Sequence, residues 1–151
     1  MNSRKESILV IDDEKNIRDG CKAILEDEGW HVETCEDGEA GIEAARHAAF
    51  DMALVDLKMP GLGGIEVFHA IRSMDPSILV VVITGYATVQ SAVDAMKQGA
   101  YDFVAKPFSP DQLIIVVRRA LEKRAMERSA RNLRQQLDRL RMDFVAMVSH
   151  E

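Results

Sequence analysis

Five polar side chains in this sequence come directly after, or at the end of, apolar segments of strand length. Asp12 and Asp13 follow the first segment, Asp56 ends the third, and Thr84 and Lys106 follow the fourth and fifth. Continuous apolar runs of this length are typical of strands that are buried on both faces of a parallel sheet. Because ligands bind beyond the carboxyl ends of such strands, these five side chains are expected to meet at one sheet edge.

Three of these groups are carboxylates, and clustered carboxylates repel one another unless a cation compensates their charge. Mg²⁺ fits a site that has few carboxylates, several waters and a phosphate ligand. Lys106 adds a positive charge, and Thr84 adds a hydroxyl donor. The set therefore predicts a carboxylate nucleophile that accepts a phosphoryl group while metal and lysine neutralise the transferred oxygens. Taken singly, each residue has an ordinary alternative role, such as a cap or turn for an aspartate.

The segments that must position these residues alternate between strand and helix periodicity five times. Strands are predicted at residues 7–11, 30–35, 51–55, 78–83 and 101–105. Helices are predicted at residues 15–28, 39–48, 64–73 and 88–98, and from Pro110 onward after a Ser109 N-cap. Five such units predict an α/β fold, a flavodoxin-like doubly wound parallel sheet in the order 2-1-3-4-5. In that order strands one and three flank the crevice, so Asp12, Asp13 and Asp56 would face one another.

Composition restricts the class of protein. The chain has 151 residues, of which 47% are hydrophobic and 29% are charged, which allows one domain with a sizeable core plus an appendage. No apolar run is long enough to span a membrane and no signal-peptide pattern begins the chain, so we expect a cytoplasmic protein without a membrane partner. Cys21 and Cys35 are too few for a disulfide framework, and the four histidines have no metal-ligand spacing.

The balance of charge changes near Arg118. Residues 1–117 carry ten Lys and Arg against twenty Asp and Glu, whereas residues 118–151 carry nine against five. The basic charges of the second part alternate with a regular apolar stripe. This pattern favours a solvated helix face over a surface for nucleic acid, so no direct nucleic-acid partner is expected.

Residues 7 to about 120 resemble the receiver domain of two-component response regulators. The resemblance rests on the acidic pair at 12–13, the pattern V-D-L-K-M-P-G at 55–61, Thr84-Gly85 and Lys106-Pro107-Phe108. It implies a phosphoacceptor signalling switch in a phosphorelay, with a histidine kinase or phosphotransfer protein as the phosphodonor. It also implies that the domain catalyses its own phosphorylation and dephosphorylation.

The same resemblance implies a role for each site residue. Asp56 would be the phosphorylated aspartate. Asp13 would bind Mg²⁺ directly, and Asp12 would assist, often through water. The backbone carbonyl of Lys58 would be a further metal ligand, beside the carboxylate of Asp56.

Three residues on the last two strands would read the phosphorylation state. Thr84 and Lys106 would contact the phosphoryl group. The switch aromatic, three residues before the lysine, is Phe103, at a position where the family often has Tyr. We expect Thr84 to move toward the phosphoryl group and Phe103 to repack inward, which would change the face of the fourth helix, fifth strand and fifth helix.

A second pattern begins after the fifth helix has started. Apolar residues recur at spacings of four and three, as an a/d heptad seam of about three heptads: Met126, Ala130, Leu133, Leu137, Leu140, Phe144 and Met147. No Gly or Pro interrupts the segment, so we expect one continuous helix that pairs as a coiled coil in a homodimer. An amphipathic helix folded back on its own domain remains an alternative. We divide the chain into a receiver domain at 1–122 and a linker helix at 123–151.

Residues 144–151, F-V-A-M-V-S-H-E, resemble the opening of the phosphoacceptor helix of sensor histidine kinases, in which His150 would be phosphorylated. We therefore expect a fragment of a hybrid protein that continues into a kinase. Nothing in this chain resembles an ATP-binding domain, so the chain itself is not expected to be a kinase. Two alternatives remain: a stand-alone receiver with an oligomerisation tail, and a phosphohydrolase with an aspartyl-phosphate intermediate. The second is disfavoured because Lys58 occupies the position where such enzymes generally place another acid.

Overall fold

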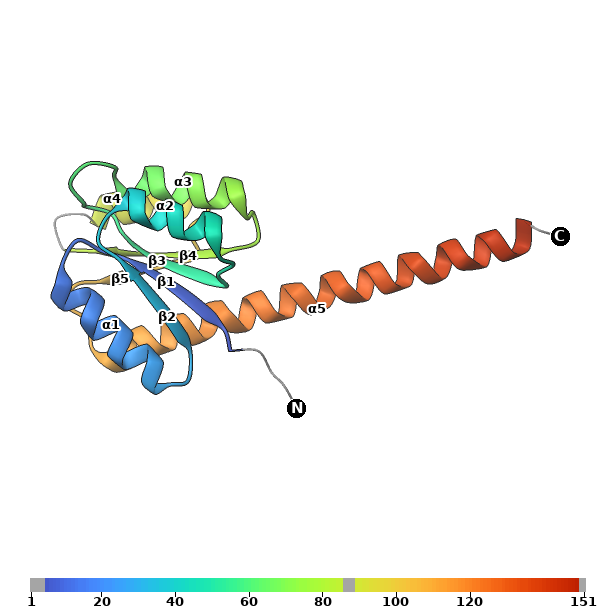
Figure 1. The fold of residues 1–151 in the computed structure, drawn as a ribbon, viewed down its shortest axis with the longest axis horizontal. Coiled ribbons are helices and arrows are strands. Elements are labelled where there is room, and N and C mark those ends of the chain that lie inside the picture. Colours follow the sequence, from blue (N-terminus) through green and yellow to red (C-terminus); the bar gives the residue numbers. More distant parts are fainter. Residues whose placement is uncertain (1–4, 86–88, 150–151) are drawn as a thin grey trace.

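The structure is a computed structural model that describes residues 5–85 and 89–149, and it is built around one parallel sheet (Figure 1). Its strands are β1 (Ser7–Ile11), β2 (His31–Cys35), β3 (Met52–Asp56), β4 (Leu79–Thr84) and β5 (Asp102–Ala105). They lie in the order β2-β1-β3-β4-β5, and each neighbouring pair is parallel. The predicted flavodoxin-like order is therefore confirmed.

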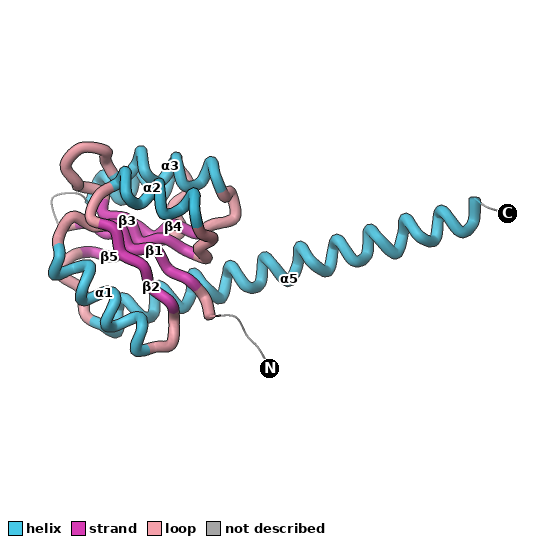
Figure 2. The backbone as a smooth tube through the Cα atoms, in the orientation of Figure 1, coloured by secondary structure: helices cyan, strands magenta, loops and turns pink. Residues whose placement is uncertain are grey.

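Helices connect the strands and cover both faces of the sheet. They are α1 (Lys15–Asp27), α2 (Gly38–His47), α3 (Gly64–Met74), α4 (Val89–Lys97) and α5 (Pro110–Ser149). Figure 2 shows α1 and the first part of α5 on one face, with α2, α3 and α4 on the other. The helices and strands start or end within one or two residues of their predicted bounds, which is the usual precision for helix ends.

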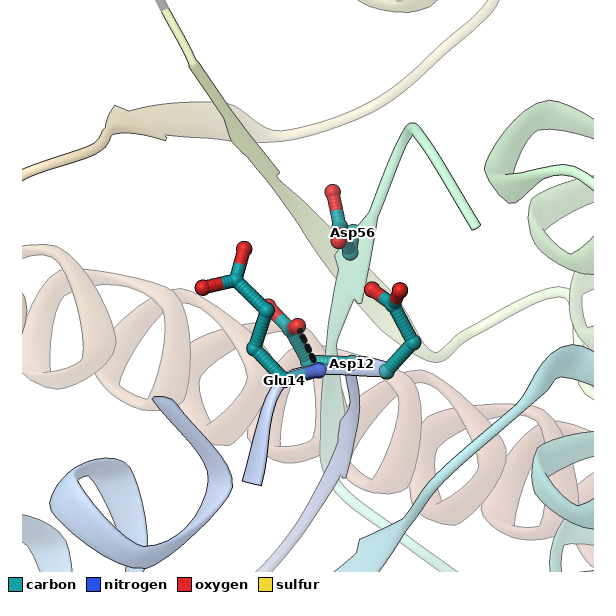
Figure 3. A group of neighbouring side chains, drawn as sticks. Asp12, Glu14 and Asp56 are labelled. Atoms are coloured by element: carbon teal, nitrogen blue, oxygen red, sulfur yellow. Dashed lines mark hydrogen bonds between the residues drawn. The ribbon is translucent and has the colours of Figure 1, made fainter. Parts of the chain in front are cut away.

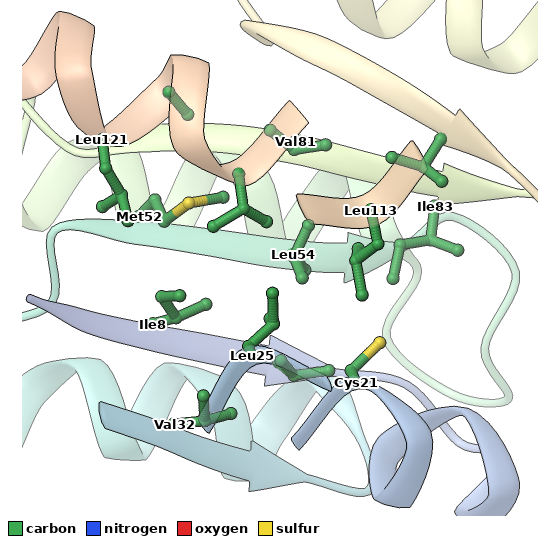
Figure 4. Packing of buried hydrophobic residues seen from close by; sticks show 14 of the residues in the cluster. Ile8, Cys21, Leu25, Val32, Met52, Leu54, Val81, Ile83, Leu113 and Leu121 are labelled. Atoms are coloured by element: carbon green, nitrogen blue, oxygen red, sulfur yellow. The ribbon is translucent and has the colours of Figure 1, made fainter. Parts of the chain in front are cut away.

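The two faces are separated by the alternation of side chains along each strand. On β1, Ile8 and Val10 point toward α1 and α5, and Leu9 packs in the opposite layer with α2 and α3. Figure 4 shows the first layer, in which Leu25 of α1 and Leu113 of α5 meet over the strands. Burial on both faces explains why the central strands are apolar throughout.

The edge strand β2 differs from the central strands because it has one partner, β1. Val32 is buried, whereas His31 and Glu33 on either side are exposed. The alternating pattern predicted for this segment is therefore explained by its position at the edge of the sheet.

The close approach of α3 to β3 requires a glycine. A Cβ added at Gly64 would collide with the backbone carbonyl oxygen of Asp56. Because Gly64 is the first residue of α3, the helix can start directly beside the last residue of β3. The loop between them is thereby held close to the carboxyl edge of the sheet.

The last helix has two parts that differ in their surroundings. Residues Leu113, Val117, Ala120 and Leu121 are buried against the sheet, and every described residue after Arg124 is exposed. Figure 1 shows the second part, residues 125–149, extending away from the domain as a straight helix that we call the rod. The predicted continuous helix is present, and the rod does not fold back on its own domain. No helix in the described ranges is long and apolar enough to cross a membrane.

Candidate functional site

The carboxyl ends of β1 and β3 lie side by side, which brings two predicted aspartates together. Ile11 pairs with Val55 in the sheet, so Asp12 comes directly after β1 where Asp56 ends β3. Both carboxylates are buried, at 0% and 4% exposure. Figure 3 shows Asp56 above the loop that carries Asp12 and Glu14.

Four acidic residues surround this point. Each of Asp12, Asp13, Glu14 and Asp56 has a carboxylate oxygen within 4.8 Å of those of the others. Asp13 and Glu14 are exposed, so the acidic cluster opens toward solvent on their side. Glu14 was not predicted as a site residue. The signal was present in the sequence, because Glu14 continues the acidic run of 12–13.

One lysine reaches into the acidic cluster from the end of β5. The Nζ atom of Lys106 lies 3.0 Å from Asp12 Oδ2, 3.0 Å from Glu14 Oε1 and 3.3 Å from Asp56 Oδ2. The side chain of Lys106 is largely buried, at 15% exposure. A single ammonium group therefore faces several carboxylates, and negative charge is in excess.

Burial and this excess charge shift two pKa values. Burial, with the nearby charge of Asp12, raises the pKa of Asp56 to about 6, although the Lys58 N–H and the Lys106 ammonium oppose the shift. Burial also lowers the pKa of Lys106, but its ion pairs with Asp12, Glu14 and Asp56 outweigh that effect and the pKa is raised. Lys106 thus remains a cation at neutral pH.

Backbone contacts hold the two buried aspartates in place. Asp12 Oδ1 accepts a hydrogen bond of 2.8 Å from the Glu14 N–H, and Arg18 Nη1 donates to the Asp12 carbonyl at 2.9 Å. Asp56 Oδ1 accepts from the Lys58 N–H at 3.1 Å. These hydrogen bonds therefore fix the orientation of both carboxylates.

The donor set fits a hard divalent cation. Asp12 Oδ2 is buried and accepts no hydrogen bond of acceptable geometry from the described residues, although Lys106 Nζ lies 3.0 Å away as an ion pair. Carboxylate oxygens are the ligands that Mg²⁺ prefers. An oxygen with free lone pairs beside Asp13 and Asp56 is the arrangement expected of such a site.

The other predicted residues differ in how deeply they are buried. Thr84 is buried at the end of β4, and its hydroxyl donates to the Gly85 carbonyl at 3.1 Å. Phe103 is 38% exposed. The backbone carbonyl of Lys58 is predicted as a metal ligand. No contact of this carbonyl with the described residues bears on that role, which stays a prediction. His150, the predicted kinase phosphoacceptor, lies outside the described residues.

Comparison with known proteins finds a matching family and similar relatives for this chain. The model of the response regulator receiver domain family matches residues 8–118. The nitrogen assimilation regulatory protein NtrX of Azorhizobium caulinodans is 36% identical over 130 residues, or 85% of this chain and 29% of that protein. The C4-dicarboxylate transport transcriptional regulatory protein DctD of Rhizobium meliloti is 33% identical over 132 residues, or 87% of this chain and 29% of that protein.

Solved structures agree with these matches. The receiver domain of NtrX from Brucella abortus superimposes with a TM-score of 0.74 at 40% identity, covering 76% of this chain and 98% of that one. The chain spans about 29% of the length of the two curated relatives. Both are named as regulatory proteins, and neither name mentions a kinase.

Proposed function

The chain belongs to the response regulator receiver domain family, and from this premise we propose that Asp56 accepts a phosphoryl group from a histidine kinase or phosphotransfer protein. The observation that carries the proposal is the position of the Lys106 ammonium, 3.3 Å from Asp56 Oδ2 and inside the acidic cluster. A carboxylate with such a neighbour can attack phosphorus while the lysine balances charge on the phosphoryl oxygens.

The transfer exchanges one bond to phosphorus for another. An oxygen of Asp56 forms a bond to the phosphorus atom, and the bond from phosphorus to the donor atom breaks. The electron pair of the broken bond leaves with the donor, an imidazole nitrogen of a histidine or the oxygen of acetate. The nucleophile must be ionised, and a pKa of about 6 leaves Asp56 mostly ionised at pH 7.5.

We propose that Asp12, Asp13 and Asp56, with the backbone carbonyl of Lys58, hold Mg²⁺. Two observations support this assignment. Asp12 Oδ2 is buried without a hydrogen bond from the described residues, although the Lys106 ammonium lies 3.0 Å away, and carboxylates outnumber that one ammonium group. When bound, Mg²⁺ supplies positive charge that offsets repulsion among the carboxylates and on the phosphoryl oxygens. Asp12 keeps its orientation through the Glu14 N–H, and Lys106 keeps its proton throughout.

We propose that Thr84 and Phe103 convert phosphorylation into a change of surface. Phe103 pairs with Val82 on β4, the strand that ends in Thr84. It is partly exposed and lines a groove of about 410 Å³ with Ile115 and Val116 of α5. Inward movement of Phe103 would reshape that groove. To turn a mostly inactive population into a mostly active one, phosphorylation must favour the active state by about 5 kcal/mol.

We further propose that residues 1–122 form the receiver unit and that residues 123–151 form a dimeric coiled coil. Leu121 is the last buried residue of α5, and the seam residues Leu133, Leu137 and Phe144 are all more than half exposed. Burying such side chains against a second copy is worth about 1.5–3 kcal/mol each. Light scattering should find residues 1–151 dimeric at micromolar concentration and residues 1–122 largely monomeric. A monomer for the longer chain would refute the coiled coil.

The coupling of the rod to a histidine-kinase helix remains a separate proposal that rests on the F-V-A-M-V-S-H-E pattern at 144–151. The curated relatives are named as regulators and give this coupling no support. The predicted lack of direct nucleic-acid contact and the cytoplasmic location of this chain likewise remain predictions. Autophosphorylation assays on a chain that extends beyond Glu151 would test the kinase coupling.

Intact-mass spectrometry tests the central proposal. With acetyl phosphate and Mg²⁺, the protein should gain one phosphoryl group, which hydroxylamine should remove because it attacks acyl phosphates. Asp56→Asn and removal of Mg²⁺ should each abolish the gain. The control Asp27→Asn changes an exposed aspartate at the end of α1 and should be phosphorylated like the wild type. Undiminished phosphorylation of Asp56→Asn would exclude the assignment.

A further inference from the structure

A third buried aspartate lies just before β3, at the end of the strand opposite Asp56. Asp51 is 2% exposed. Its Oδ2 accepts a hydrogen bond of 2.8 Å from the Ser7 N–H at the start of β1. Its Oδ1 accepts a hydrogen bond of 3.1 Å from Arg128 Nη2, and Arg124 Nε lies 3.7 Å from the same oxygen. Two arginines of α5 thus meet at one buried carboxylate of the sheet.

Arg124 makes further contacts with the turn that leads into β4. Its side chain is only 12% exposed. Its Nη2 lies 3.7 Å from Asp75 Oδ2, and its Nη1 donates to the hydroxyl of Ser77. Ser77 is itself held, because its N–H and its hydroxyl donate to Asp75 Oδ1 at 3.0 and 2.6 Å. We call these five residues the α5 clamp: Asp51, Asp75, Ser77, Arg124 and Arg128.

The arginines of the α5 clamp lie further along α5 than the apolar residues that are buried against the sheet. Leu121 is the last buried residue of α5, and Arg128 lies seven residues later, about 10 Å along the helix. A weaker contact, Lys123 Nζ at 5.3 Å from the ring of Tyr101, lies on the same stretch. The ion pairs therefore hold the first turns of a helix that has no apolar residue buried there.

The clamp does not use the face that the coiled coil requires. With Met126 at d and Ala130 at a, Arg124 takes position b and Arg128 position f, which lie away from an a/d seam. The same helix can therefore dock on its own domain by one side and on a second copy by the other. This separation also means that the arginines can be replaced without changing the seam.

We propose that the α5 clamp fixes the direction in which the rod leaves the receiver, so that domain and rod move as one body. This inference rests on the proposed function, because it gives the rod its part in passing the state of the receiver onward. Arg124 and Arg128 are positioning residues and take no part in the chemistry at Asp56. They connect α5 to the start of β3, whose other end carries the phosphoacceptor.

Electron–electron distance measurements between two spin labels test the clamp. Labels on Glu39→Cys in α2 and Asp138→Cys in the rod, in a Cys35→Ser background, report the angle between domain and rod. Cys21 can stay because it is buried, and burial raises its pKa to about 12. Dilution with unlabelled protein removes distances between two copies in a dimer.

In the wild type the distance distribution should be narrow. In Arg124→Gln/Arg128→Gln it should become at least twice as wide. The control Arg134→Gln/Arg141→Gln removes two exposed charges from the same helix and should keep the wild-type width. Equal widths in the clamp variant and the control would overturn the proposal.

Phosphorylation of the same samples with acetyl phosphate separates this inference from the proposed function. The clamp variant should take up one phosphoryl group at the wild-type rate, because its changes lie at the opposite edge of the sheet. If the wild type takes up none, the proposed function fails while the distance result still decides the clamp. A clamp variant that is phosphorylated normally but keeps a narrow distribution refutes the clamp alone.

Discussion

The two ends of β3 each carry a buried aspartate, and the surroundings of these aspartates are opposite. Asp51 is matched by two arginines and a backbone N–H. Asp56 shares one lysine with other carboxylates, and its pKa is raised to about 6. Removing one partner of a buried, charge-matched carboxylate destabilises a structure, whereas a buried carboxylate with excess negative charge around it suits a site for a cation. The same residue type thus has a structural role at one end of the strand and, as we propose, a chemical role at the other.

The largest expected effect is on stability at the matched end. Asp51→Ala removes the partner of Arg124 and Arg128 and leaves the Ser7 N–H unsatisfied. Breaking such a buried pair costs about 3–5 kcal/mol of unfolding free energy. Urea denaturation followed by circular dichroism measures this loss. If Asp51→Ala and Asp56→Ala lower the free energy of unfolding equally, the contrast between the two ends of β3 is wrong.

The next effect concerns the rate of phosphorylation. Lys106→Gln removes the ammonium beside Asp56, and loss of one charge-stabilising donor lowers a rate by about 10²–10³-fold. Initial rates with acetyl phosphate at pH 7.5, followed by intact mass, measure the change. Lys97→Gln removes an exposed charge at the end of α4 and should retain the wild-type rate. A similar loss in both variants would mean that bulk charge, rather than the position of Lys106, controls the reaction.

A smaller effect is a pH dependence of stability to which the carboxyl group of Asp56 contributes. Its pKa is higher in the folded protein, about 6, than the ordinary value of 3.8, so the folded state binds the extra proton between these values. Stability should therefore fall as pH rises from about 4 to 6 and stay lower above that range. Asp56→Asn should not lose stability in this way. Its free energy of unfolding should exceed that of the wild type by on the order of 2–3 kcal/mol at pH 8, but by little at pH 4. Denaturation without Mg²⁺ measures the free energy of unfolding of both proteins against pH. If the two curves run parallel, the assignment is wrong.

The smallest predicted effect is stabilisation by Mg²⁺. A ligand that binds the folded state at one hundred times its dissociation constant adds about 2.7 kcal/mol, and at ten times about 1.4 kcal/mol. Thermal melts with and without Mg²⁺ should show this gain in the wild type, and Asp12→Asn should reduce it. NaCl at equal ionic strength separates site binding from screening. An equal shift in Asp12→Asn would place the ion elsewhere.

The positions of the residues at the unmatched end could be predicted from sequence because they depend on strand ends. Asp12, Asp56 and Lys106 each terminate or follow an apolar run, and parallel pairing brings such ends together whatever the details. Glu14 was missed as a neighbour of Lys106 because the reach of its side chain depends on how α1 begins. Thr84 was placed at the correct edge, but the partner of its hydroxyl, the Gly85 carbonyl, follows from local backbone geometry alone.

The matched end could not be predicted in the same way. Asp51 and Arg128 are 77 residues apart, and neither belongs to a local sequence pattern that indicates an ion-pair partner. Arg124 and Arg128 look like ordinary surface charges of an amphipathic helix. Their pairing depends on the angle at which α5 crosses the sheet, which is set by packing of residues such as Leu113 and Val117. Periodicity gives the helix but not that angle.

The length of the rod amplifies any change in the direction that the clamp fixes. From Arg124 to Ser149 the helix extends about 38 Å at 1.5 Å per residue. A change of about 10° in the direction that the clamp fixes would therefore displace the far end sideways by about 7 Å. A small change of direction at the clamp would thus suffice to move the far ends of two paired rods sideways relative to each other.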